Sequence, residues 1–288
     1  MFSACRINPP GQPEVEDAKK RLAPRYPPKS VSISEFGMLP KRSIVNRRMC
    51  WYNFKRKKAT LIKRKTRFRA RKIIDWRLCF IADSGATEGR DILSLVKRAV
   101  DGGATLIQLR GKIWSTREFL EFGIKIRKML EVKNVPLIIN DKVDIALACG
   151  AAGVHLGQED LPLRLARKIL GNKRIIGISV NTPDEAEAAE NEGADYLGAG
   201  PVFPTSSKNN LGPLLGLEGI RRIRAKVKIP ILAIGGIKAS NAAKVISAGV
   251  DGVAVISAIA ASPSPNKAAT EIIESIGKVK IRSGASEN

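Results

Sequence analysis

Between Leu78 and Ile276 the chain alternates short apolar runs with longer amphipathic segments, and this alternation limits the possible folds most strongly. We expect the apolar runs to form strands over Leu78–Ala82, Thr105–Leu109, Leu137–Ile139, Gly153–Leu156, Ile175–Ser179, Tyr196–Ala199, Ile231–Ile234 and Gly252–Ile256. The amphipathic segments predict helices over Asp91–Asp101, Thr116–Val132, Lys142–Cys149, Pro162–Leu170, Pro183–Glu192, Leu217–Lys226, Ser240–Ala248 and Asn266–Ile276. Eight such units in about 200 residues predict a (β/α)8 TIM barrel.

The residues at the predicted element ends support this fold class. Pro162 and Pro183 suit the first turn of a helix, and Gly150 and Gly171 directly follow predicted helices. The main alternative is an open, doubly wound sheet, which usually carries a G-x-G-x-x-G turn after its first strand. Because no such turn follows the first predicted strand, the barrel is the better prediction.

The first 75 residues differ in composition from the rest. They hold 21 Lys and Arg against 5 Asp and Glu, so most of the net charge of +23 lies there. Residues 1–40 are rich in proline and residues 41–72 interleave cations with aromatic side chains, so we expect a disordered extension. A basic arm of this kind can bind RNA or DNA, and nucleic acid is a possible partner only through residues 41–72. An accessory extension, or a segment added by an upstream start, is the simpler interpretation.

We therefore divide the chain into the extension 1–75, a catalytic barrel over 76–277 and a tail over 278–288. Four cysteines without C-x-x-C spacing and a single histidine disfavour a His/Cys metal site and fit thiols in a reducing compartment. No apolar run is long enough to span a membrane. We expect a cytoplasmic protein without a membrane partner. Formation of a homo-oligomer is possible.

In a (β/α)8 barrel the chemistry lies at the C-terminal ends of the strands. Here the second predicted strand ends in Gln108-Leu-Arg-Gly-Lys112, in which alternate residues place an amide and two cations on one face. The third strand ends in Asn140-Asp141, and the fourth leads to Asp160. Two carboxylates on adjacent strand ends can hold Mg²⁺ against a diphosphate, although Asp141 could instead cap the following helix.

The later strand ends are rich in glycine and hydroxyl groups. After the sixth predicted strand the loop runs from Gly198 to Lys208, with hydroxyls and backbone N–H groups for phosphate oxygens and one cation. Gly235-Gly236 after the seventh strand, with Ser257 after the eighth, fits the phosphate site that recurs in this fold. The mouth of the barrel is thus predicted to hold two anion-binding sites, and Mg²⁺ is predicted to assist binding at only one of them.

Taken in order, these motifs resemble those of the thiamine-phosphate synthase family over about residues 77–277. The matching segments are Gln108–Lys112, Asn140-Asp141, Gly153–Asp160, Gly177–Ser179, Gly198–Lys208, Gly235–Ile237 and Ile256–Ile259. The resemblance implies a Mg²⁺-dependent transferase that joins hydroxymethylpyrimidine diphosphate to hydroxyethylthiazole phosphate and releases pyrophosphate.

The resemblance also implies roles for individual residues. Asp141 and Asp160 would carry Mg²⁺, and the catalytic set would be Arg110, Lys112, Ser179 and Lys208. The substrate-binding residues would be Gln108, Arg110, Lys112, Asn140, Ser179, Thr205, Ser207, Lys208, Gly236, Ile256 and Ser257. One departure concerns the second strand, where Gly111 stands in place of the usual Glu and could loosen the placement of Lys112.

Three alternatives stay open at this point. A related thiazole tautomerase would use a histidine near the end of strand five, where this chain has Ile178-Ser-Val-Asn181. The single histidine, His155, lies on the fourth strand and is interpreted as a packed structural residue. A sugar-phosphate isomerase would explain the glycine pair but not the two carboxylates. A nucleic-acid-binding protein would act through the basic arm.

Overall fold

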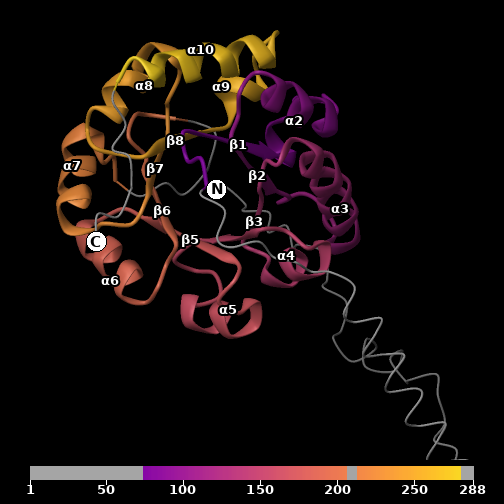
Figure 1. The fold of residues 1–288 in the computed structure, drawn as a ribbon, viewed down its shortest axis with the longest axis horizontal. Helices are drawn as coiled ribbons and strands as arrows, with labels where there is room; N and C mark the ends of the chain where they lie inside the picture. Colours follow the sequence, from indigo (N-terminus) through magenta and orange to yellow (C-terminus); the bar gives the residue numbers. More distant parts are fainter. Residues whose placement is uncertain (1–73, 206–212, 280–288) are drawn as a thin grey trace, which may run out of the picture. The chain divides into compact units, whose positions relative to one another are not determined.

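The computed structural model describes residues 74–205 and 213–279. They form a closed barrel of eight parallel strands whose spatial order follows the sequence, with helices around the outside (Figure 1). The predicted (β/α)8 fold is therefore confirmed. The predictions for the N-terminal extension up to residue 73, for Ser207 and Lys208, and for the tail beyond residue 279 lie outside the described residues.

The barrel strands are β1 (Leu78–Asp83), β2 (Leu106–Arg110), β3 (Leu137–Asn140), β4 (Gly153–Leu156), β5 (Ile175–Val180), β6 (Tyr196–Ala199), β7 (Ile231–Ile234) and β8 (Gly252–Val255). The helices are η2 (Ser84–Ala86), α2 (Ile92–Asp101), α3 (Thr116–Lys133), α4 (Val143–Cys149), α5 (Leu163–Leu170), α6 (Pro183–Asn191), α7 (Gly216–Lys226), α8 (Ala239–Ile246), α9 (Ser257–Ala260) and α10 (Pro265–Gly277). Helix α10 packs beside both α8 and α2, and so joins the last helices of the ring to the first (Figure 1).

The predicted elements agree with these bounds to within two residues at each end, with three local corrections. Pro162 is the residue before α5 rather than part of its first turn. Ile256 lies beyond β8 because its backbone, at φ −112° and ψ −84°, has left the extended conformation. The short helices η2 and α9 were not predicted, since three or four residues carry no readable hydrophobic period.

Strand alternation divides the core into two parts. Inside the barrel, inward side chains form one cluster of Cys79, Ile81, Leu106, Ile138, Tyr196, Leu232, Ala254 and Ile256. The alternate strand residues, such as Phe80 and Ile107, point outward and pack against the helices in a larger cluster. Strands buried on both faces are typical of parallel sheets. The inward positions near the C-terminal ends are therefore the ones that can face a ligand.

The opposite, N-terminal end of the barrel is tied by two similar arginine–aspartate pairs. Arg167 of α5 contacts Asp195, at 2.6 Å from Nη2 to Oδ2, and Arg224 of α7 contacts Asp251 at 3.1 Å. Each carboxylate also accepts a hydrogen bond from a strand N–H, at Ile176 and Ile231 respectively. These part-buried pairs hold helices to strands and lie away from the strand ends that carry polar residues.

Two expectations about the chain as a whole can be compared with the structure. The two cysteines among the described residues, Cys79 and Cys149, are buried free thiols, and burial raises the pKa of Cys79 to about 12. Of the helices that the structure describes, none is long and apolar enough to cross a membrane.

Candidate active site

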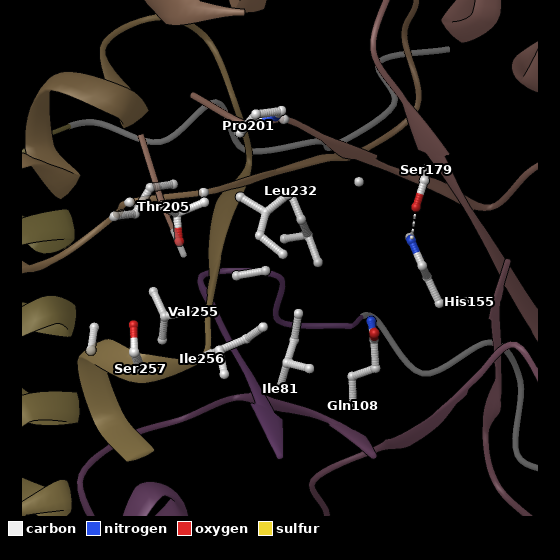
Figure 2. Close-up of a pocket in the computed structure, with 18 of the residues that line it drawn as sticks. Ile81, Gln108, His155, Ser179, Pro201, Thr205, Leu232, Val255, Ile256 and Ser257 are labelled. Carbon is white, nitrogen blue, oxygen red and sulfur yellow. Dashed lines mark hydrogen bonds between the residues drawn. The ribbon is translucent and has the colours of Figure 1, made fainter. Parts of the chain in front are cut away.

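The C-terminal ends of the strands surround a pocket of about 470 Å³. Its wall includes many of the residues singled out in the sequence: Gln108, Arg110, Asn140, Ser179, Thr205, Gly236, Ile256 and Ser257. Figure 2 shows Ser179, His155 and Gln108 at one end of this pocket and Thr205 with Ser257 at the other. The pocket is therefore long enough to have two chemically different ends, with apolar side chains such as Ile81 and Leu232 between them.

The first end is charged, and its arginine is held by a buried carboxylate. Arg110, the last residue of β2, donates from Nη1 to Oδ2 of Asp83, the last residue of β1. The barrel register places these two residues directly opposite each other. The other carboxylate oxygen of Asp83 accepts from the N–H of Gly85 at 2.9 Å, and its side chain is only 3% exposed. Asp83 therefore holds the guanidinium of Arg110, which lines the pocket, in a fixed position.

Beyond Arg110, at the rim, Lys112 and two carboxylates form a second charged group. Lys112 Nζ lies 2.6 Å from Asp141 Oδ2, and the carboxyl groups of Asp141 and Asp160 are close enough for each to shift the pKa of the other. Burial and the neighbouring Asp141 carboxyl raise the pKa of Asp160. Burial also acts to raise the pKa of Asp141, but Lys112, Asp160 and Arg110 together hold it below its usual range. Ionisation of Asp141 thus makes ionisation of Asp160 less favourable.

The backbone presents Asp141 to the mouth rather than to the helix behind it. Asp141 adopts a left-handed conformation with φ 63°, and its N–H donates to the carbonyl of His155 at 2.8 Å. Helix α4 begins after Lys142 and has no side-chain cap, so the alternative in which Asp141 caps this helix is wrong. A backbone in this uncommon region is a feature that clusters at functional sites.

These residues fit a divalent cation. Two carboxylates close enough to raise the pKa of one of them would be relieved by a shared positive ion. Among the described residues no group of three or more His, Cys, Asp or Glu side chains could hold a metal. Mg²⁺ is suited to such a sparse set, because it commonly takes one or two carboxylates and completes its shell with water and substrate phosphate.

The inner wall of the charged end is a hydrogen-bonded row of side chains. His155 Nδ1 lies 2.9 Å from the hydroxyl of Tyr196, and its Nε2 lies 3.0 Å from Oγ of Ser179 (Figure 2). Burial raises the pKa of Tyr196 well above its usual value, and the side chain of Gln108 acts in the opposite direction. All four residues point inward from β2, β4, β5 and β6.

The second end of the pocket is made largely of backbone. Gly235 and Gly236 follow β7 with φ values of 100° and 63°, a region that side chains other than glycine rarely occupy. A Cβ on Gly236 would lie 2.7 Å from both the Cβ of Phe203 and the carbonyl oxygen of Pro204. Thr205 and Ser257 bring hydroxyls to this end. Close backbone with exposed N–H groups suits a phosphate better than a cation.

The structure brings most, but not all, of the predicted site residues together. Lys112, Asp141 and Asp160 are not part of the pocket wall, although the charge of Arg110, which is, helps to lower the pKa of Asp141. Ser207 and Lys208 lie outside the described residues, so their predicted roles stay predictions. At Gly111 the Trp114 and Phe119 rings fill the space, since a Cβ there would lie 2.8 Å and 2.9 Å from them. Packing of this kind restrains the backbone next to Lys112.

Two residues of the site were missed in the sequence. Asp83 ends a strand that was predicted to stop at Ala82, and Tyr196 was counted only as an apolar strand residue. The signal that could have identified Asp83 was its place directly after an apolar run, as for Asn140 at the end of the third strand. His155, interpreted as structural, lines the pocket and contacts Ser179.

The fold and the site together define a (β/α)8-barrel enzyme whose mouth is built for two anionic groups. Residues 78–259 match the family model described as thiamine monophosphate synthase. The chain is 49% identical over 205 residues to thiamine-phosphate synthase of Moorella thermoacetica, covering 71% of this chain and 98% of that one. It is 46% identical over 200 residues to the synthase of Chloroflexus aurantiacus, covering 69% and 92%.

A solved structure is similar as well. Thiamine phosphate pyrophosphorylase from Pyrococcus furiosus is 41% identical, with a TM-score of 0.66, and the match covers 71% of this chain and 97% of that one. The chain belongs to the thiamine monophosphate synthase family. It is thus a transferase, and the predicted thiamine-phosphate synthase activity is confirmed.

Proposed function

We propose that the pocket binds hydroxymethylpyrimidine diphosphate at its charged end and hydroxyethylthiazole phosphate at its backbone end, and joins them. The observation that carries this proposal is one pocket with two different anion-binding ends. The bond between the pyrimidine methylene carbon and the diphosphate oxygen breaks, and its electron pair leaves with the diphosphate. The thiazole nitrogen then donates its lone pair to the methylene carbon, giving thiamine phosphate and pyrophosphate.

The charged end supports this reaction because negative charge grows on the leaving group as the carbon–oxygen bond breaks. Arg110 and Asn140 line this end of the pocket and are proposed to bind that group. Lys112, which is paired with Asp141 outside the pocket wall, is proposed to join them. Asp83 holds Arg110 in place, so the guanidinium does not need to reorganise during the reaction. Ser179 and Gln108 line the inner wall, where the pyrimidine ring would lie. Lys208 is proposed as a further cation for the diphosphate, by family resemblance alone.

Asp141 and Asp160 are the residues that would hold Mg²⁺. The ion would supply positive charge to the diphosphate oxygens. Lys112 is paired with Asp141, so its ammonium would be available to the diphosphate once the carboxylate has another partner. This exchange of partners explains why a cation and a carboxylate are placed side by side at a site for an anion.

At the other end, Thr205, Gly236, Ile256 and Ser257 are proposed to hold the thiazole phosphate, with Ser207 assigned by the resemblance. Backbone N–H groups near Gly236 would bind the phosphate oxygens without adding charge. This phosphate is not changed in the reaction, so its site is expected to contribute binding and orientation rather than acceleration.

The test is a direct assay of the purified full-length chain with both substrates. We expect pyrophosphate release and thiamine phosphate formation with Mg²⁺, and loss of both when EDTA is present. Release that does not require the thiazole phosphate, or full activity in EDTA, would contradict the proposed reaction or the Mg²⁺ role respectively.

Small-molecule substrates account for the pocket, and we propose a cytoplasmic location for the enzyme. Binding of nucleic acid through residues 41–72 and formation of a homo-oligomer are separate proposals. Affinity for RNA that falls steeply with salt and disappears when residues 1–73 are removed would support the first. Size-exclusion chromatography with light scattering would test the second.

A further inference from the structure

Two strand glycines leave a space inside the barrel that a tyrosine and a histidine fill. A Cβ on Gly177 of β5 would lie 2.2 Å from the ring of Tyr196 and 2.6 Å from Nδ1 of His155. A Cβ on Gly198 of β6 would lie 2.8 Å from Cε1 of His155. Real Cβ atoms do not approach so closely, so both glycines are needed to seat the pair. Tyr196 and His155 are therefore held in one arrangement by the surrounding barrel.

The hydrogen bonds of this pair have a direction. The Tyr196 hydroxyl lies in the barrel interior, where its raised pKa keeps it protonated. The Gln108 side chain acts to lower that pKa, which is the effect of a group that donates to the phenolic oxygen. Its own hydrogen is then directed to Nδ1 of His155, 2.9 Å away. A ring nitrogen that accepts a hydrogen bond carries no hydrogen, so a neutral imidazole must carry its hydrogen on Nε2. That Nε2–H can only donate, and its partner is Oγ of Ser179 at 3.0 Å.

This row of hydrogen bonds therefore determines whether the Ser179 hydroxyl donates or accepts a hydrogen bond in the pocket. Because its oxygen accepts from His155, the hydroxyl hydrogen of Ser179 cannot point back along the row and is left for the pocket that Ser179 lines. We propose that Tyr196 and His155 are positioning residues that fix the imidazole in the Nε2–H form and so make Ser179 a hydrogen-bond donor to the substrate. This inference rests on the proposed function for the identity of that substrate, an acceptor atom of the pyrimidine diphosphate.

The opposite arrangement would have a different consequence. If His155 carried its hydrogen on Nδ1, Ser179 would donate to Nε2 and could only accept from the substrate. The two forms differ only in the position of one proton. The tyrosine and the amide behind it favour the Nε2–H form, because Tyr196 can give its hydrogen to His155 only when Nδ1 is bare.

The chain contains a single histidine, which makes the tautomer directly measurable. Full-length protein labelled with ¹⁵N-histidine should give one set of imidazole signals, without assignment by mutation. At neutral pH and without substrate we expect a bare Nδ1 and a protonated Nε2. A signal pattern of Nδ1–H, or an equal mixture of the two forms, would overturn the proposal, whatever the protein's activity.

Kinetics provide the second test, through a double-variant cycle. Tyr196→Phe keeps the ring in place and removes only the hydroxyl; we expect a fall of about tenfold in kcat, the scale of one neutral hydrogen bond. Ser179→Ala should cost at least as much. In the Ser179→Ala background, Tyr196→Phe should have no further effect on kcat, because the row then has nothing to orient.

A matched control removes a half-buried hydroxyl at the other end of the barrel. Thr105 contacts the backbone of Leu78 through its Oγ1 at 3.1 Å, before β2 begins. Thr105→Val should leave kcat within about twofold of wild type, and thermal unfolding should show that each variant folds. Equal losses from Tyr196→Phe with and without Ser179 would show a structural role alone and contradict the proposal. Wild-type turnover tests the proposed function separately, since the tautomer is measured without substrate.

Discussion

The two ends of the pocket bind anions by different means. The end formed by β1 to β5 uses charged side chains, and in the structure these are already paired with one another, as Arg110 with Asp83 and Lys112 with Asp141. The end formed by β6 to β8 uses close backbone at Gly235 and Gly236, with hydroxyls from Thr205 and Ser257. One end has charge that can be redistributed, and the other has dipoles that are fixed by the main chain.

The difference corresponds to what each substrate group undergoes. A diphosphate that leaves gains negative charge in the transition state, so charges placed there lower the barrier. A phosphate that is only carried along keeps its charge, so the groups that bind it stabilise the ground state and the transition state alike. Changes at the charged end should therefore reduce kcat, while changes at the backbone end should raise KM.

The largest effect is expected at the charged end itself. Asp141→Ala or Arg110→Ala should each lower kcat by about 10²–10³-fold, the scale of removing one preorganised transition-state contact. Circular dichroism should show an intact barrel in both variants, since both side chains lie at the strand ends. Arg110→Ala should in addition unfold at a lower temperature, because it leaves the buried Asp83 carboxylate without its partner. Full activity in a folded Asp141→Ala variant would refute the proposed Mg²⁺ site.

The second effect should separate the two ends most clearly. In Gly236→Ala the new Cβ would lie 2.7 Å from Phe203 and Pro204, at a φ of 63° that alanine rarely adopts. We expect the KM for the thiazole phosphate to rise about tenfold or more, with kcat at saturation nearly unchanged. The matched control is Gly277→Ala at the end of α10, where a Cβ would meet nothing within 4 Å. A fall in kcat at unchanged KM would show that this end also acts on the transition state.

A smaller effect on kcat is expected from Asp83, which holds Arg110 at the charged end. Asp83→Asn keeps the shape of the side chain but removes the charge that holds Arg110, so we expect kcat to fall about tenfold. Asp195→Asn removes a comparable pairing with Arg167 at the opposite end of the barrel. Both variants should unfold at lower temperature than wild type, but only Asp83→Asn should lose turnover. Equal losses of turnover would mean that Asp83 acts through stability alone.

The smallest effect concerns Gly111 in the segment that follows β2. The rings of Trp114 and Phe119 occupy the space that a side chain would need, so Gly111→Ala should destabilise the barrel by about 1–3 kcal/mol. We expect only a few-fold change in the KM for the pyrimidine diphosphate, through the displaced Lys112 backbone. A stabilised, more active Gly111→Ala variant would show that the aromatic packing does not position Lys112.

The sequence was sufficient for the fold and for part of the site. Eight alternating units define a barrel, and residues at strand ends such as Gln108 and Asn140 must then face its mouth. The pairing of Asp83 with Arg110 could not be predicted, because 27 positions separate them and only the barrel register brings them together.

Other parts of the site depend on backbone and packing that a sequence pattern does not contain. The pattern gave no reason to separate Tyr196 from its apolar neighbours, since its role comes from the space left by Gly177 and Gly198. The position of Lys112 outside the pocket wall follows from its contact with Asp141, which strand alternation alone does not predict.

The most direct test of the contrast between the two ends is the effect of Mg²⁺ on the binding of each substrate, measured by calorimetry with the full-length chain. We predict that Mg²⁺ tightens the binding of the pyrimidine diphosphate at least tenfold and leaves that of the thiazole phosphate unchanged. In Asp141→Asn the Mg²⁺ effect should disappear. Equal tightening of both substrates, or a Mg²⁺ effect that survives in Asp141→Asn, would contradict the account.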